Sequence, residues 1–177
     1  MNNWKRIWKP IVVLSVICVI VTGALAATNE VTAPIITQAK IEAENAARLA
    51  VLPDADGFTE VTGIAVDGVS AVYTANNGVG AAITASAKGY GGDVVVMVGI
   101  NADGNIEAIT VTQQTETKGI GSNVVSNNEY LAQYSGMSAA EPLVLNEDVD
   151  AYASATVSST AVINAVNAAI TAYNQIP

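Results

Sequence analysis

The residues best placed to do chemistry are hydroxyl side chains at the expected start of the last helix. The stretch Asp150-Ala151-Tyr152-Ala153-Ser154-Ala155-Thr156 leads through Val157-Ser158-Ser159-Thr160 into an apolar pattern with helical spacing. Thr156 is therefore expected just before the helix, where backbone N–H groups lack intrahelical acceptors and favour a phosphate. The same hydroxyls also suit ordinary helix capping. Spacing by itself leaves both interpretations open.

A second candidate site is the loop Thr115–Gly121, which contains two glycines. Gly119 and Gly121 would let the backbone approach a flat ligand closely, although a simple turn explains them equally well. Glu116 precedes these glycines. Most Glu side chains are exposed, so a solvated loop carboxylate is the alternative to a ligand contact there.

The elements that must position these loops follow from periodicity and turn signals. Residues 35–52 have helical spacing and end at Pro53 and the run Asp54-Ala55-Asp56-Gly57. Short β-type runs follow, separated by Asp67-Gly68 and Asn76-Asn77-Gly78. The runs are residues 58–66, 71–75, 81–87, 93–100 and 106–113.

The run Asp93–Ile100 is almost continuously apolar, which predicts a central strand covered on both faces, with Val95, Met97 and Val98 deeply buried. We also expect a short helix at 123–134, a strand at 143–145 and a closing helix at 158–173. The predicted fold class is α+β: one sheet, flanked by the first and last helices.

The N-terminus carries a candidate membrane segment. Residues 11–27 contain no charge and follow Lys5, Arg6 and Lys9, and the polar stretch 29–34 is typical of a turn-like exit. The positive-inside rule predicts a cytoplasmic segment 1–10, a transmembrane helix 11–27 and an extracytoplasmic domain 28–177. A signal peptide cleaved after Ala24-Leu25-Ala26 fits the residues equally well.

Composition excludes several kinds of function. The chain has no His, and its one cysteine, Cys18, lies in the apolar run, so we expect neither a disulfide nor a zinc or iron–sulfur site. Three of the seven basic residues precede Pro10, whereas all 16 acidic residues follow it. This acidic body argues against nucleic-acid binding, which requires a basic surface.

Four segments, in order, resemble motifs of the FMN-binding domain family. These are Gly89-Tyr90-Gly91-Gly92, the hairpin Val98-Gly99-Ile100-Asn101-Ala102-Asp103-Gly104, the loop Glu116-Thr117-Lys118-Gly119-Ile120-Gly121, and Asp150 through Thr156. The last is similar to the family signature Asp-x-x-(Ser/Thr)-Gly-Ala-Thr. Ala153 and Ser154 depart from it, Lys118 replaces a usual Pro, and Gln114 replaces a common His. Gly at position 154 would permit backbone angles that Ser resists.

The resemblance implies covalent FMN, joined to Thr156 by a phosphoester bond. It further implies that Ser154, Ala155 and Val157 surround the attachment point, and that Glu116, Thr117, Gly119 and Gly121 contact the cofactor. A separate FAD-dependent FMN transferase would load the threonine. The chain would contain no catalytic residue and would act as a redox subunit of an ion-translocating oxidoreductase, without activity alone.

Within the family, the short chain with one N-terminal apolar segment is most similar to G subunits of Rnf complexes. These are membrane-bound, ion-translocating ferredoxin:NAD oxidoreductases. The resemblance favours a retained anchor, an inner or cytoplasmic membrane location, and other Rnf subunits as partners. Two alternatives stay open: a C-type subunit of a sodium-pumping quinone reductase, and an anchored binding domain without redox activity.

Overall fold

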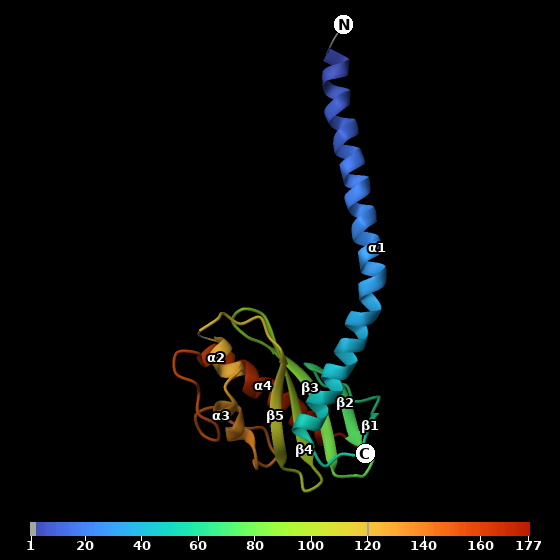
Figure 1. The fold of residues 1–177 in the computed structure, drawn as a ribbon. Coiled ribbons are helices and arrows are strands. Elements are labelled where there is room, and N and C mark those ends of the chain that lie inside the picture. Colours follow the sequence, from blue (N-terminus) through green and yellow to red (C-terminus); the bar gives the residue numbers. More distant parts are fainter. Residues whose placement is uncertain (1–2, 120) are drawn as a thin grey trace. The chain divides into compact units, whose positions relative to one another are not determined.

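The computed structural model describes residues 3–119 and 121–177, so Ile120 of the predicted ligand loop lies outside the described residues. The chain divides into two compact units, residues 1–43 and 44–177. Figure 1 shows helix α1, then a sheet with helices around it.

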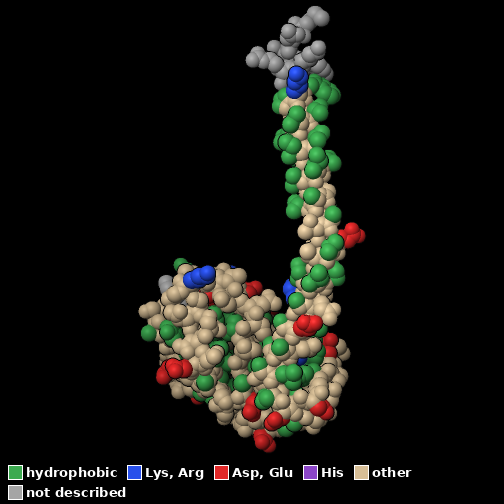
Figure 2. All heavy atoms as spheres, viewed as in Figure 1, with side chains coloured by type: hydrophobic (Ala, Val, Ile, Leu, Met, Phe, Trp, Pro, Cys, Tyr) green, Lys and Arg blue, Asp and Glu red, His purple; other side chains and the backbone are tan. Residues whose placement is uncertain are grey.

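Helix α1 runs from Asn3 to Val51 and contains Pro10 and Pro34. The predicted turn at 29–34 is therefore wrong. Thr28 and Thr32 donate their hydroxyls to the carbonyls four residues earlier, at 2.9 and 3.0 Å, so these side chains lie along the helix instead of ending it. Hydrophobic side chains are exposed along the helix (Figure 2), and within Trp8–Val51 it is long and apolar enough to cross a membrane.

The sheet is an antiparallel meander of five strands in the order β1-β2-β3-β4-β5. Together with the helices it confirms the predicted α+β class. The strands are β1 (Phe58–Glu60), β2 (Val69–Ala75), β3 (Gly80–Lys88), β4 (Asp93–Asn101) and β5 (Ile106–Gln113). Short helices α2 (Gly121–Val125), α3 (Asn128–Leu131) and η1 (Ala132–Tyr134) follow, and α4 (Thr156–Tyr173) closes the chain.

The two faces of the sheet are covered by different helices. Behind the sheet in Figure 1, α4 packs on β3 and β4, and it shares the main core with alternate residues of β4. On the other face the end of α1 contributes Val51, which packs with Ala82 and Met97. A Cβ on Gly99 would collide with the Val51 carbonyl, so glycine allows this close approach of α1 to β4.

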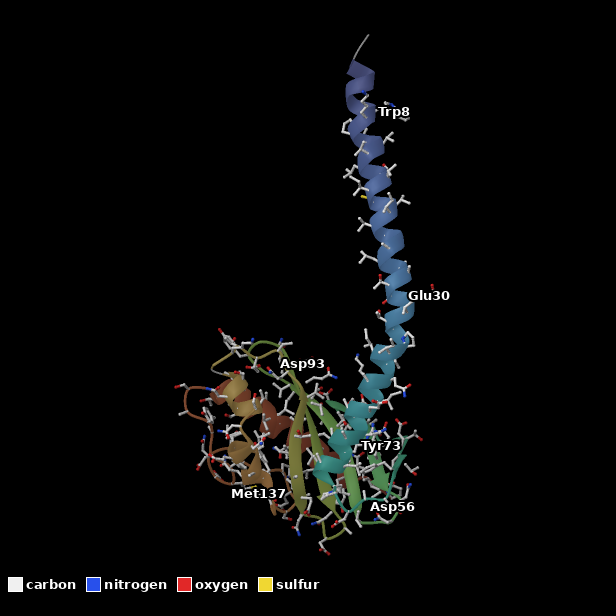
Figure 3. All side chains as sticks on the ribbon, viewed as in Figure 1. Trp8, Glu30, Asp56, Tyr73, Asp93 and Met137 are labelled. Carbon is white, nitrogen blue, oxygen red and sulfur yellow. The ribbon has the colours of Figure 1, made fainter. Side chains whose placement is uncertain are left out.

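Met97 and Val98 are buried as predicted, but Val95 is only half-buried. It lies beyond the part of β4 that α1 covers, in an open groove of about 970 Å³ shared with Asp93 and Thr112. Figure 3 labels Asp93 at this end of the sheet. The central strand is thus covered on both faces over only part of its length.

Three other predicted elements are shorter or absent. The strand expected at 58–66 ends at Glu60, and Gly63 beyond it has a φ of 95°. The helix expected at 123–134 is split because Asn127 caps a new start at α3. No strand forms at 143–145, where the Asn167 side-chain amide pairs with the N–H and the carbonyl of Leu143 instead.

Candidate functional site

Helix α4 begins at Thr156, two residues earlier than predicted, so Thr156 is its first residue and does not precede it. The N-cap position belongs to Ala155, which has no side chain able to accept a hydrogen bond. Just before it, Ser154 has a φ of 66°, the left-handed conformation that suits glycine. Gly, the usual residue at this position of the family signature, would adopt this angle without strain.

The first turn of α4 therefore leaves backbone donors free. The Ser159 N–H donates to the Ala155 carbonyl at 3.0 Å and is the first donor to join the helical ladder. The N–H groups of Thr156, Val157 and Ser158 have no acceptor within the described part of the chain. Three converging N–H groups at the positive end of an 18-residue helix suit an anionic group.

Three of the four hydroxyls in this turn are already engaged. Ser158 donates to Glu116 Oε2 at 2.6 Å, and Thr160 donates to the Thr156 carbonyl at 2.8 Å. Ser159 donates to the Ala155 carbonyl at 3.1 Å and accepts from the Tyr152 N–H at 3.0 Å. Thr156 is exposed, and among the described residues its hydroxyl has no partner.

Glu116 is buried, with 7% of its surface exposed, so it is not a solvated loop carboxylate. Oε2 accepts from Ser158, and Oε1 accepts from the Gly91 N–H at 3.1 Å. A Cβ on either Gly89 or Gly121 would collide with this carboxylate. Glu116 thus joins the turn at 89–92 to the first turn of α4, and Gly121 makes room for that contact.

These segments enclose a pocket of about 620 Å³. Its lining includes seven of the eight predicted site residues: Glu116, Thr117, Gly121, Ser154, Ala155, Thr156 and Val157. Gly119 does not line it; its N–H donates to the Ser122 hydroxyl at 2.9 Å. Sequence reasoning missed Tyr90 and Ser158 as lining residues, although the motif around Tyr90 pointed to its turn.

Residues 44–177 contain three basic residues, and two of them adjoin segments that line the pocket. These are Arg48, Lys88 and Lys118. Arg48 lies 3.8 Å from the centre of the Tyr73 ring and pairs with Glu44 at 3.2 Å (Figure 3 labels Tyr73). Lys88 adjoins the turn at 89–92, and Lys118 follows Thr117, so both lysines belong to segments that border the pocket.

The pocket suits an elongated ligand with one anionic end. Free N–H groups and the free Thr156 hydroxyl can meet a phosphate, while Tyr90 and Val157 offer apolar surface to a flat ring. The lining contains no His, Cys or Lys side chain that could serve as a base beside Thr156. These features are compatible with binding of an anionic, partly apolar ligand.

Comparisons with known proteins agree with this interpretation. A family model described as FMN-binding domain matches residues 89–171. The G subunit of the Na⁺-translocating ferredoxin:NAD⁺ oxidoreductase complex of Acetobacterium woodii is 32% identical over 198 residues, covering 98% of this chain and 95% of that one.

Two further relatives carry similar names. The G subunit of the proton-translocating ferredoxin:NAD⁺ oxidoreductase complex of Clostridium ljungdahlii is 26% identical, covering 89% of this chain and 86% of that one. The G subunit of the ion-translocating oxidoreductase complex of Methanosarcina acetivorans is 29% identical, covering 96% of each chain.

Among solved structures, Shewanella oneidensis NqrC has a similar fold, with a TM-score of 0.50, 20% identity and coverage of 73% of this chain and 72% of that one.

Proposed function

Because the chain belongs to the G subunits of ion-translocating ferredoxin:NAD⁺ oxidoreductase (Rnf) complexes, we propose that it relays electrons through FMN attached covalently to Thr156. The relay would be coupled to transport of Na⁺ or H⁺ by the complex. The names of the relatives support the Rnf role, and the FMN-binding domain match supports the cofactor.

The observation that carries the attachment site is the partnering of the hydroxyls. Ser158, Ser159 and Thr160 each donate to a protein oxygen, whereas the Thr156 hydroxyl is exposed and has no partner in the described chain. Thr156 also lines the pocket. A phosphoester can therefore form at Thr156 without breaking an existing hydrogen bond.

The start of α4 suits the phosphate of such an ester. A phosphodiester keeps one negative charge, and the N–H groups of Thr156, Val157 and Ser158 are available to it. The helix dipole adds about 0.3–1 kcal/mol for a charge at this end. Ala155 supports this use because, unlike Ser or Asp, it does not fill the N-cap position with a competing acceptor.

The cofactor would supply the redox chemistry of the electron relay. FMN accepts and releases electrons, and the protein's contribution is binding, orientation and electrostatics. Loading by a separate FAD-dependent transferase would form a bond from Thr156 Oγ1 to the FMN phosphorus, break the pyrophosphate link to AMP, and release AMP and the hydroxyl proton. This chain needs no base of its own for that step.

The N-terminal segment supports a membrane location. Residues 11–27 are uncharged and lie in the part of α1 that is apolar enough to span a membrane. We propose a retained anchor with residues 1–10 in the cytoplasm and the FMN domain on the extracytoplasmic side, since Lys5, Arg6 and Lys9 precede the span. The remaining Rnf subunits would be its partners.

The test is the mass of the full chain after expression with its transferase. The unchanged chain should gain one FMN less one water, and peptide mapping should place it on Thr156. Thr156→Ala should carry no covalent flavin yet remain folded, because its hydroxyl holds no hydrogen bond in the described chain.

Thr160→Ala is the matched control, since it removes a neighbouring hydroxyl that is already bonded to the Thr156 carbonyl. It should be loaded fully. FMN mapped to Thr160 or Ser158, or fluorescence of denatured Thr156→Ala protein, would contradict the proposal.

A further inference from the structure

Large apolar side chains are rarely exposed in the folded unit, and half of those that are exposed border the pocket. In residues 44–177 the exposed examples are Leu49, Tyr90, Val144 and Val157, with 46%, 78%, 47% and 52% of their surface accessible. Tyr90 and Val157 both line the pocket. The most exposed aromatic ring of the unit therefore lies at the proposed cofactor site.

The rest of the pocket lining is small or polar. It consists of Glu116, Thr117, Gly121, Ser154, Ala155, Thr156 and Ser158. Apolar area is thus concentrated on Tyr90 and Val157, and Tyr90 supplies the aromatic ring of the lining. Since Val157 directly follows Thr156, its side chain lies close to the proposed attachment point.

The backbone of the Tyr90 turn is held firmly although its side chain is exposed. The Gly89 N–H donates to the Gly92 carbonyl at 2.8 Å, and Gly91 binds Glu116 through its N–H and Thr115 through its carbonyl, at 3.1 and 3.2 Å. A Cβ on Gly91 would collide with the Thr115 carbonyl. The turn is therefore packed by its backbone, and the Tyr90 ring, being exposed, contributes little to the core.

We propose that Tyr90, together with Val157, forms the contact surface for the isoalloxazine ring of FMN carried on Thr156. This inference rests on the proposed function and adds the residues that bind the ring. The ring is flat, aromatic and largely apolar, which matches an exposed aromatic and an exposed aliphatic side chain in one pocket. Binding would cover apolar surface that is otherwise open to water.

Flavin fluorescence tests this contact without measuring activity. A Tyr or Trp ring in contact with an excited flavin donates an electron that then returns, which quenches emission, whereas Phe and Leu do not donate. In the full chain, loaded with FMN and kept in detergent, Tyr90→Leu and Tyr90→Phe should raise the fluorescence per bound FMN severalfold. Tyr90→Trp should keep it low.

Iodide quenching tests the Val157 side of the surface. Val157→Ala should make the bound flavin more accessible to iodide. Val144→Ala is its matched control, because Val144 is similarly exposed but does not line the pocket, and it should leave accessibility unchanged.

The outcomes separate this inference from the proposed function. If the unchanged chain carries FMN on Thr156 but Tyr90→Leu alters neither fluorescence nor iodide access, the proposed contact between Tyr90 and the flavin ring is wrong. If the unchanged chain carries no FMN on Thr156, the proposed function fails and this inference with it. Mass spectrometry before the optical measurements identifies which case holds.

Discussion

Helices α3 and α4 differ in whether a side chain accepts hydrogen bonds from the N–H groups of their first turn. In α3, the Asn127 side chain accepts from the N–H groups of Glu129 and Tyr130, at 2.9 and 3.4 Å, so a neighbouring residue caps the helix. In α4, Ala155 offers no cap, and the N–H groups of the first turn have no acceptor in the described chain. The longer helix, which shares the main core, has the less satisfied start.

The difference lies in what holds each start in place. The start of α3 is fixed locally by Asn127. The start of α4 is held locally by the Ser159 hydroxyl, which bonds the Tyr152 N–H and the Ala155 carbonyl. It is also held from a distance by Glu116, whose carboxylate accepts from Ser158, 42 residues later in the chain. Because that contact uses a side chain of the helix and not its N–H groups, the backbone donors stay available to a ligand.

Among the substitutions that test this difference between the two helix starts, Glu116→Ala should have the largest effect on stability and on FMN loading. It leaves the Ser158 hydroxyl, on a residue only 2% exposed, and the Gly91 N–H without their acceptor. Leaving a buried donor such as the Ser158 hydroxyl without its acceptor costs about 1–3 kcal/mol, so the unfolding free energy should fall by that amount. Loading of FMN should fall as well, since two walls of the pocket lose their link.

Denaturant unfolding of the full chain in detergent measures this through near-ultraviolet circular dichroism of the tyrosines, all of which lie in residues 44–177. Glu116→Gln keeps one acceptor oxygen and should lose less stability. An Ala variant as stable as the unchanged chain would show that Glu116 does not hold the start of α4.

Asn127→Ala should have a smaller effect that is confined to α3. Removing an N-cap typically costs about 1 kcal/mol. Because Asn127 does not line the pocket, FMN loading should stay complete. A loss of covalent flavin, measured by mass, would mean that the two helix starts are not independent.

Ser154→Gly should have the smallest effect and the opposite sign. The left-handed φ of 66° strains Ser but not Gly, at about 1–2 kcal/mol, and the extra freedom of Gly in the unfolded chain offsets part of the gain. We expect the unfolding free energy to rise by up to about 1 kcal/mol, with loading unchanged. A lower midpoint in the same denaturant titration would show that the Ser154 side chain stabilises the turn.

Much of the fold could be predicted from local patterns. The runs that became β3, β4 and β5 lie between strong turn signals, and the apolar stripe of α4 is plain in the sequence. The predicted turn at 29–34 failed because Thr and Asn are typical of helix ends, whereas here Thr hydroxyls bond back along α1. Val95 is half-exposed because α1 packs over only part of the sheet face. The extent of that packing is not encoded in any local sequence pattern.

Motifs predicted most of the residues that line the pocket, but they did not predict the hydrogen bonds among them. Motif order placed Thr156 and the Glu116 loop together, and the pocket includes both. That Ser158 is engaged and Thr156 is free depends on Glu116 lying between two distant segments, which spacing along the chain cannot reveal. Tyr90 was overlooked because an exposed aromatic in a glycine turn carries meaning only once its neighbours in space are known.

From the long sequence separation of Glu116 and Ser158 we expect an order of events during folding. The hairpins of the meander close over a few residues, as at 89–92 and 102–105, whereas this contact closes a loop of 42. Loop closure becomes entropically harder with length, so contacts distant in sequence are expected to form after local ones. A pocket assembled from residues 90, 116 and 156 exists only when the chain has finished folding, so FMN attached there would mark a chain as correctly folded before it is assembled.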